Sequence, residues 1–137
     1  MDKRKADAGK GYAVRFIRID GEPIEEYLYS TKADADNHLR LFVDDKSGLY
    51  KRIAVLDQKT QTVEHILVFE NGSMRMHLTD GDTVRLRKEY ASPKEREFLF
   101  TVSNIHEDIG RCMITTKNNK TSFPARESVN LEMIEKG

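Results

Sequence analysis

Residues 81–90 read GDTVRLRKEY, and three runs of the same kind follow it: REFLFTVSNI at 96–105, GRCMITTK at 110–117 and SVNLEMIEKG at 128–137. Each run is short and rich in β-forming residues, and turn-forming residues separate one run from the next. Short strands at this spacing are typical of a small antiparallel barrel, closed or nearly closed. We therefore expect the last third of the chain to form such a barrel, a fold that more often binds ligands than catalyses reactions.

The first half of the chain predicts one helix among four strands. Strands are expected at 12–19, 24–30, 49–57 and 62–70. Between the two hairpins that they form, a helix is expected from about Lys32 to Phe42, because its apolar residues follow helical spacing. Thr31 is the expected N-cap, with Asp34 at the third helical position. The predicted order for residues 12–72 is thus β-β-α-β-β.

The two halves are expected to form one compact α+β protein. No long linker lies between 12–72 and 73–137, because the junction consists of the turn signal Asn71-Gly72 and a short apolar stretch. Residues 1–11 read as a flexible arm. Apolar residues lie on both faces of the predicted strands in the first half, and one helix covers only one face of a sheet. The second face needs cover from the barrel or from another copy of the chain, so self-association is one hypothesis.

Composition restricts the class of protein. Lys plus Arg and Asp plus Glu number 23 each, a balance that argues against the basic excess of a typical nucleic-acid-binding domain. The single cysteine, Cys112, excludes an intrachain disulfide and is expected to be a buried thiol. No apolar run is long enough for a membrane span, and the first residues lack the features of a signal peptide. We expect no membrane association and a cytoplasmic location.

Catalytic motifs are missing from the sequence. There is no Gly-x-Ser-x-Gly elbow and no glycine-rich phosphate loop. His38 falls four residues after Asp34 on the predicted helix, but a third metal ligand is not evident. We therefore expect neither an enzyme nor a bound cofactor. A small metal-dependent enzyme, using His38 with Asp34 or Asp45, is the second alternative.

The runs GDTVRL, GRCMITT and SVNLEMIE resemble SH3-like barrel domains of the KOW and Tudor types, over roughly residues 78–137. This resemblance implies a binding module with a groove between the loops at 90–96 and 104–110. The residues near that groove would be Tyr90, Arg96, Asn104, His106 and Arg111. The whole chain is also similar to small two-part bacterial proteins, a likeness that implies no activity.

The expected function is a non-catalytic binding or adaptor module in a bacterial cytoplasm, with a protein partner or a second copy of the chain as its ligand. A nucleic-acid-binding regulator is the first alternative. Tyr27 and Tyr29 share one face of a predicted strand, with Arg15 on the neighbouring strand and Arg52 on a third. Aromatic rings stack on bases and arginines neutralise phosphates, although the same residues also suit an amphipathic sheet.

A second group of cations opens the predicted barrel. Arg85, Arg87 and Lys88 follow Gly81-Asp82, and Arg85 and Arg87 alternate with apolar residues. This alternation is typical of any half-buried strand, so by itself it does not indicate a binding surface.

Overall fold

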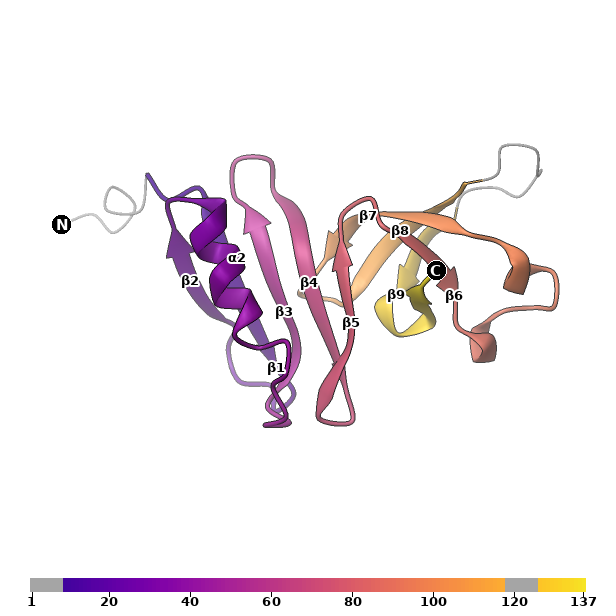
Figure 1. Ribbon diagram of the computed structural model, residues 1–137, viewed down its shortest axis with the longest axis horizontal. Helices are drawn as coiled ribbons and strands as arrows, with labels where there is room; N and C mark the ends of the chain where they lie inside the picture. Colours follow the sequence, from indigo (N-terminus) through magenta and orange to yellow (C-terminus); the bar gives the residue numbers. More distant parts are fainter. Residues whose placement is uncertain (1–8, 118–125) are drawn as a thin grey trace. The chain divides into compact units, whose positions relative to one another are not determined.

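The computed structural model describes residues 9–117 and 126–137 (Figure 1). The chain divides into two compact units, with the boundary between His77 and Leu78. Antiparallel strands make up most of the described chain, and α2 (Lys32–Arg40) is the one α-helix within it. The predicted α+β class is thus confirmed in its coarse form. None of the described helices is long and apolar enough to cross a membrane.

The first sheet contains five strands. They are β1 (Tyr12–Arg18), β2 (Glu25–Tyr29), β3 (Tyr50–Asp57), β4 (Thr62–Glu70) and β5 (Ser73–Thr79). Their order across the sheet is β2-β1-β3-β4-β5, and β1 pairs antiparallel with both β2 and β3. The sheet therefore has one strand more than the four predicted from the sequence.

The additional strand, β5, follows β4 through the tight turn at Asn71-Gly72. Both turn residues have positive φ, 53° and 83°, as a two-residue hairpin of this kind requires. Because β5 joins the first sheet, the boundary between the units lies beyond the predicted one at residues 72 and 73. The predicted arm at 1–11 lies outside the described residues up to residue 8, and the carbonyl of Gly11 accepts a hydrogen bond from the Gln58 N–H at 2.8 Å.

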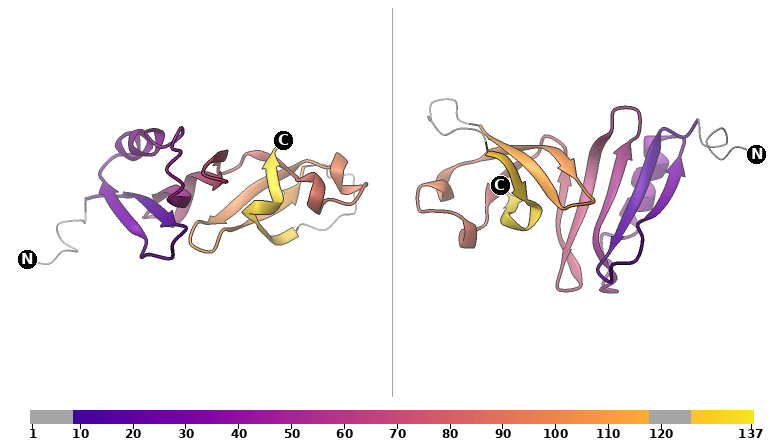
Figure 2. Two further views of the ribbon diagram at one scale, coloured as in Figure 1. Left: turned by 90° about the horizontal axis from the view of Figure 1, so that it is seen from below. Right: turned by 180° about the vertical axis from the view of Figure 1, so that it is seen from behind.

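Helix α2 lies across one face of the first sheet (Figure 2). The hydroxyl of Thr31 accepts a hydrogen bond from the Asp34 N–H at 3.2 Å, which confirms the predicted N-cap. The helix ends at Arg40, before the predicted end at Phe42, because the chain turns at 41–44. The core between helix and sheet consists of Val14, Phe16, Ala35, Leu39, Ile53, Val55 and Leu67.

The second unit contains a separate five-stranded sheet. Its strands are β6 (Thr83–Leu86), β7 (Phe100–His106), β8 (Arg111–Thr116), β9 (Arg126–Asn130) and β10 (Ile134–Lys136). Three short 3-10 turns lie at η1 (Lys88–Tyr90), η2 (Glu95–Glu97) and η3 (Leu131–Met133). The strand order is β10-β6-β7-β8-β9, so the first strand of the unit pairs with its last.

Among the described residues this second sheet has two edges, β9 and β10, and does not close. The closed form of the predicted barrel is therefore absent from this part of the chain. The strand β10 is only three residues long and pairs with β6 alone in the described registers. On one face, Val84, Leu86 and Ile134 are each no more than 2 % exposed and contribute to an apolar core.

Candidate anion-binding pocket

A pocket of about 220 Å³ opens on the surface of the second unit. It is lined by Arg85, Leu86, Lys88, Arg96 and Glu135. These residues come from β6, from β10 and from the long segment that joins β6 to β7. The lining therefore brings together three cationic side chains, one carboxylate and one apolar side chain.

Two of the lining residues face each other across neighbouring strands. Arg85 and Glu135 are direct partners in the β6–β10 register, so their side chains share a face of the sheet. Their Nε and Oε1 atoms lie 3.3 Å apart, with 52 % and 41 % of the two side chains exposed. An ion pair this exposed contributes about 0–1 kcal/mol, so another anion can replace Glu135 on Arg85 at low cost.

A local hydrogen-bond arrangement holds Arg96 in its place. The Ser92 N–H donates to Oε1 of Glu95 at 3.1 Å, and the Glu95 N–H donates to Oγ of Ser92 at 3.3 Å. This reciprocal pair is a capping box, and the N–H of Arg96 adds a bond to the Ser92 carbonyl at 3.1 Å. Because these bonds define the turn at η2, Arg96 reaches the pocket from an ordered backbone.

Lys88 approaches the pocket from the start of the same segment. It opens η1 directly after Arg87, and the turn is closed by the Tyr90 N–H, which donates to the Arg87 carbonyl at 2.8 Å. Arg87 itself points to other partners, with Nη1 3.2 Å from the Glu132 carbonyl oxygen. The pocket is therefore lined by Lys88, whereas the neighbouring Arg87 contacts η3.

Of the five residues predicted for the groove, the pocket includes only Arg96. Tyr90 lies in the same connecting segment and is 46 % exposed. Asn104, His106 and Arg111 lie instead at the hairpin end of β7 and β8, where His106 pairs with Arg111. Asn104 has a positive φ of 47°, and its Nδ2 donates to Sδ of Met113 at 3.0 Å.

The guanidinium of Arg111 connects two strands. Its Nε donates to Oγ of Ser128 at 2.8 Å, and its Nη1 donates to Oδ1 of Asn130 at 3.1 Å. A third bond joins Nη2 to the Ser128 carbonyl at 3.4 Å. These contacts hold β8 against β9, so Arg111 stabilises the sheet and does not line the pocket.

The residues predicted for a nucleic-acid surface on the first sheet fall on two opposite faces. Tyr27 is the register partner of Val14, a core residue beneath α2, whereas Arg15 is the partner of Glu26. Arg52 is the partner of Ile17, which lies on the same face as Arg15. The tyrosines and the arginines therefore do not form one surface, and Arg15 makes an ion pair with Glu26 at 2.6 Å.

The two tyrosines instead belong to an aromatic cluster around His38. The ring centroids of Tyr27 and Tyr29 lie 5.0 and 5.7 Å from that of His38. The hydroxyl of Tyr29 lies 2.8 Å from Nδ1 of His38, and partial burial lowers the pKa of this histidine. Stacking of these tyrosines on a base would compete with these contacts.

Two of the three residues proposed as ligands in the metal-enzyme alternative have side-chain partners of another kind. His38 contacts Tyr29, and Oδ2 of Asp45 accepts a hydrogen bond from the Ser47 hydroxyl at 2.7 Å. Asp34 lies in the first turn of α2, where its N–H bonds to the N-cap. Within 9–117 and 126–137, no group of three or more His, Cys, Asp or Glu side chains is placed to hold a metal ion.

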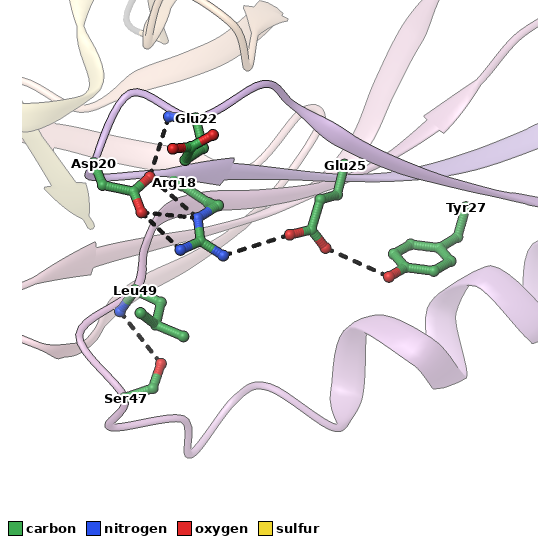
Figure 3. A network of polar contacts seen from close by, with 7 residues as sticks. All are labelled: Arg18, Asp20, Glu22, Glu25, Tyr27, Ser47 and Leu49. Carbon is green, nitrogen blue, oxygen red and sulfur yellow. Dashed lines mark hydrogen bonds and ion pairs between the residues drawn. The ribbon is translucent and has the colours of Figure 1, made fainter.

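A charged network lies at the turn between β1 and β2 (Figure 3). Nη2 of Arg18 lies 2.6 Å from Oδ2 of Asp20, and its Nη1 lies 3.6 Å from Oε1 of Glu25. The hydrogen bonds from Arg18 and from the Glu22 N–H lower the pKa of Asp20 to about 2. Arg18 faces the two carboxylates of Asp20 and Glu25, so these three side chains have a net charge of −1, and their contacts stabilise the turn.

Sequence reasoning missed two features of the pocket. The partnership of Arg85 with Glu135 depends on the pairing of the first strand with the last, which no local pattern indicates. The capping box at Ser92-Pro93-Lys94-Glu95 carries a local signal, Ser-x-x-Glu, that could have been read from the sequence. Recognising it would have indicated an ordered segment around Arg96 rather than a plain loop.

Comparisons of this chain with family models, curated proteins and solved structures find no match. Function is therefore inferred from the chemistry of the pocket. Two guanidinium groups and one ammonium group, opposed by a single carboxylate, suit the binding of an anionic group.

Proposed function

We propose that this chain is a non-catalytic binding or adaptor protein, and that its second unit binds an acidic group of a partner protein. The observation that carries the proposal is the convergence of Arg85, Lys88 and Arg96 on one open pocket. Arginine forks recognise carboxylates and phosphates through paired hydrogen bonds, and a lysine adds a point charge. In the proposed role, the pocket binds and orients a ligand without changing it.

The proposal includes an SH3-like fold for the second unit. Five antiparallel strands support it, as does the pairing of β6 with β10. The two edge strands, β9 and β10, are joined by η3 alone, as expected where a small sheet curves into a partly open barrel. The long connection between β6 and β7 then provides one wall of the binding site, as loops on small scaffolds often do.

A protein partner is favoured over a nucleic acid by the distribution of charge. The chain has equal numbers of acidic and basic side chains, and the lining cations have Glu89 and Glu97 as sequence neighbours. A polyanionic backbone would place further phosphates beside these carboxylates and be repelled. The separation of Tyr27 from Arg15 on opposite faces argues against a nucleic-acid surface on the first sheet.

The test is a binding titration of the full chain with a fluorescently labelled peptide that carries one glutamate in an otherwise uncharged sequence, followed by anisotropy. We expect binding that weakens as salt is added, because the contacts are electrostatic and exposed. Arg96→Gln should lower the affinity by about tenfold, the loss expected for one hydrogen bond between charged groups. Lys94→Gln is the matched control, because Lys94 lies in the same segment but does not line the pocket.

Three results would count against the proposed function. The acidic peptide could fail to bind, or its binding could be insensitive to Arg96→Gln. A single-stranded oligonucleotide that binds more tightly than the peptide, with a steep dependence on salt, would favour the nucleic-acid alternative.

A further inference from the structure

The charge of the pocket is the first indication of its preferred ligand. Arg85, Lys88 and Arg96 contribute three positive charges and Glu135 one negative charge, so the lining has a net charge of +2. A carboxylate carries a single negative charge, whereas a phosphate monoester carries about −1.5 to −2 at neutral pH. A monoester therefore neutralises the lining more completely than one carboxylate does.

The directions from which the donors come give the second indication. Arg85 stands on β6, Lys88 on η1 and Arg96 on η2, so three separate backbone positions surround the pocket. A carboxylate offers two oxygens in one plane, which one arginine fork satisfies. A phosphate monoester offers three oxygens around a tetrahedral centre, which suits donors that converge from three positions.

The size of the pocket limits the ligand to a small group. Its volume of about 220 Å³ is below the range of about 300–1,000 Å³ typical of sites for whole small molecules. A phosphorylated side chain that projects from a larger partner fits this limit. A chain of phosphates is disfavoured because Glu89 and Glu97 directly follow Lys88 and Arg96 in the sequence.

We infer that the pocket between β6, β10 and the 87–99 segment selects a phosphorylated side chain of a partner protein over a carboxylate. This inference rests on the proposed function and narrows its ligand. Oε1 of Glu135 lies 3.3 Å from Nε of Arg85, and a phosphate that binds Arg85 displaces this carboxylate. Glu135 thus acts as an internal competitor that a dianion overcomes more readily than a monoanion.

The test uses three short peptides that are otherwise uncharged and differ at one position, which is phosphoserine, glutamate or serine. Each is titrated into the ¹⁵N-labelled full chain, and the amide signals of Leu86, Lys88 and Arg96 are followed. We expect the phosphoserine peptide to bind at least about fivefold more tightly than the glutamate peptide, because its charge is nearly twice as large. The serine peptide should cause no change.

A pH series separates phosphate recognition from general attraction of acids. Between about pH 7.5 and 5.5 the second ionisation of phosphoserine is lost, so its affinity should fall several-fold. The glutamate side chain stays ionised over this range, so the affinity of its peptide should change little. Equal changes for both peptides would overturn the phosphate preference.

Variants locate the effect in the pocket. Arg85→Gln and Arg96→Gln should each lower the phosphoserine affinity by about tenfold, the cost of one charge-assisted contact. Glu135→Gln should raise it, because the internal competitor is removed. Lys94→Gln should leave it unchanged, and well-dispersed amide spectra of every variant establish that the fold is retained.

The outcomes distinguish this inference from the proposed function. Equal binding of the phosphoserine and glutamate peptides, both weakened by Arg96→Gln, would overturn the phosphate preference and keep the pocket as a site for acidic groups. Failure of both peptides to bind would overturn the proposed function as well. Tighter binding of a single-stranded oligonucleotide than of the phosphoserine peptide would overturn the assignment of a protein partner.

Discussion

The hydroxyl of Tyr29 lies 2.8 Å from Nδ1 of His38, a hydrogen bond that joins β2 to α2. Strand β2 is an edge of the first sheet, so it pairs with a neighbouring strand on one side only. The contact between Tyr29 and His38 therefore gives this edge strand an attachment to the helix. His38 also contacts the core, because its ring centroid lies 5.2 Å from that of the core residue Phe16.

Loss of this hydrogen bond should destabilise the first unit. We expect Tyr29→Phe to lower the free energy of unfolding by about 0.5–1.5 kcal/mol, the usual contribution of one such bond. Urea denaturation monitored by circular dichroism measures the change. Tyr27→Phe is the control, because the Tyr27 hydroxyl makes only a long contact of 3.4 Å with Glu25. An equal loss in both variants would contradict a special role for the Tyr29 bond.

The stability of the first unit should depend on the protonation of His38. Partial burial lowers the pKa of His38 below its ordinary value of 6.5, so the folded chain takes up this proton less readily than the unfolded chain. The resulting stabilisation is present above pH 6.5 and is lost as the pH falls through the folded-state pKa. The difference in unfolding free energy between the wild type and His38→Gln should therefore shrink on acidification. An NMR titration midpoint for His38 at or above 6.5 would contradict this expectation.

The carboxyl group of Asp20 should titrate in unusually acidic solution. Hydrogen bonds from Arg18 and from the Glu22 backbone lower its pKa to about 2 from 3.8. Any stabilisation from this shift is present above pH 3.8 and is lost as the pH falls through 2. Carbon NMR of the side-chain carboxyl measures the midpoint, and Arg18→Gln should return it toward 3.8. A wild-type midpoint near 3.8 would rule out the network as drawn in Figure 3.

Cys112 should be inert while the chain is folded. Its side chain is almost fully buried in β8, and burial raises the pKa of its thiol to about 12, so little reactive thiolate exists at neutral pH. We expect slow reaction with a thiol reagent in native buffer and rapid reaction in concentrated urea. Cys112→Ala gives the background rate. Equally fast labelling in both conditions would place the thiol on the surface.

Local signals made several elements of the fold predictable. Thr31 marks the start of α2 because an N-cap side chain acts on a backbone group only a few residues away. The turn at Asn71-Gly72 is equally local, since both residues tolerate positive φ. The end of α2 at Arg40 was less clear, because no glycine or proline directly follows it and the apolar spacing continues to Phe42.

The features that could not be predicted from sequence patterns depend on contacts between segments that are far apart in the chain. Apolar residues alternate in β5 as they do in many strands, and nothing in 73–79 indicates which sheet it joins. The faces assigned to Tyr27 and Arg15 depend on register, and a shift of one residue would exchange them. Arg96 was predicted at a binding site, but the pairing of Arg85 with Glu135 was not, because β10 meets β6 only in the folded unit.

The pairing of β6 with β10 has a consequence for the order in which the chain folds during synthesis. Strands β1 to β5 are complete once residue 79 has been made, whereas β6 must wait for Ile134 before its second neighbour exists. Domains generally fold from the N-terminal end as the chain emerges, at about 5–20 residues per second. For several seconds of translation, one edge of β6 thus stays open to other strands, and a stalled ribosome would prolong that interval.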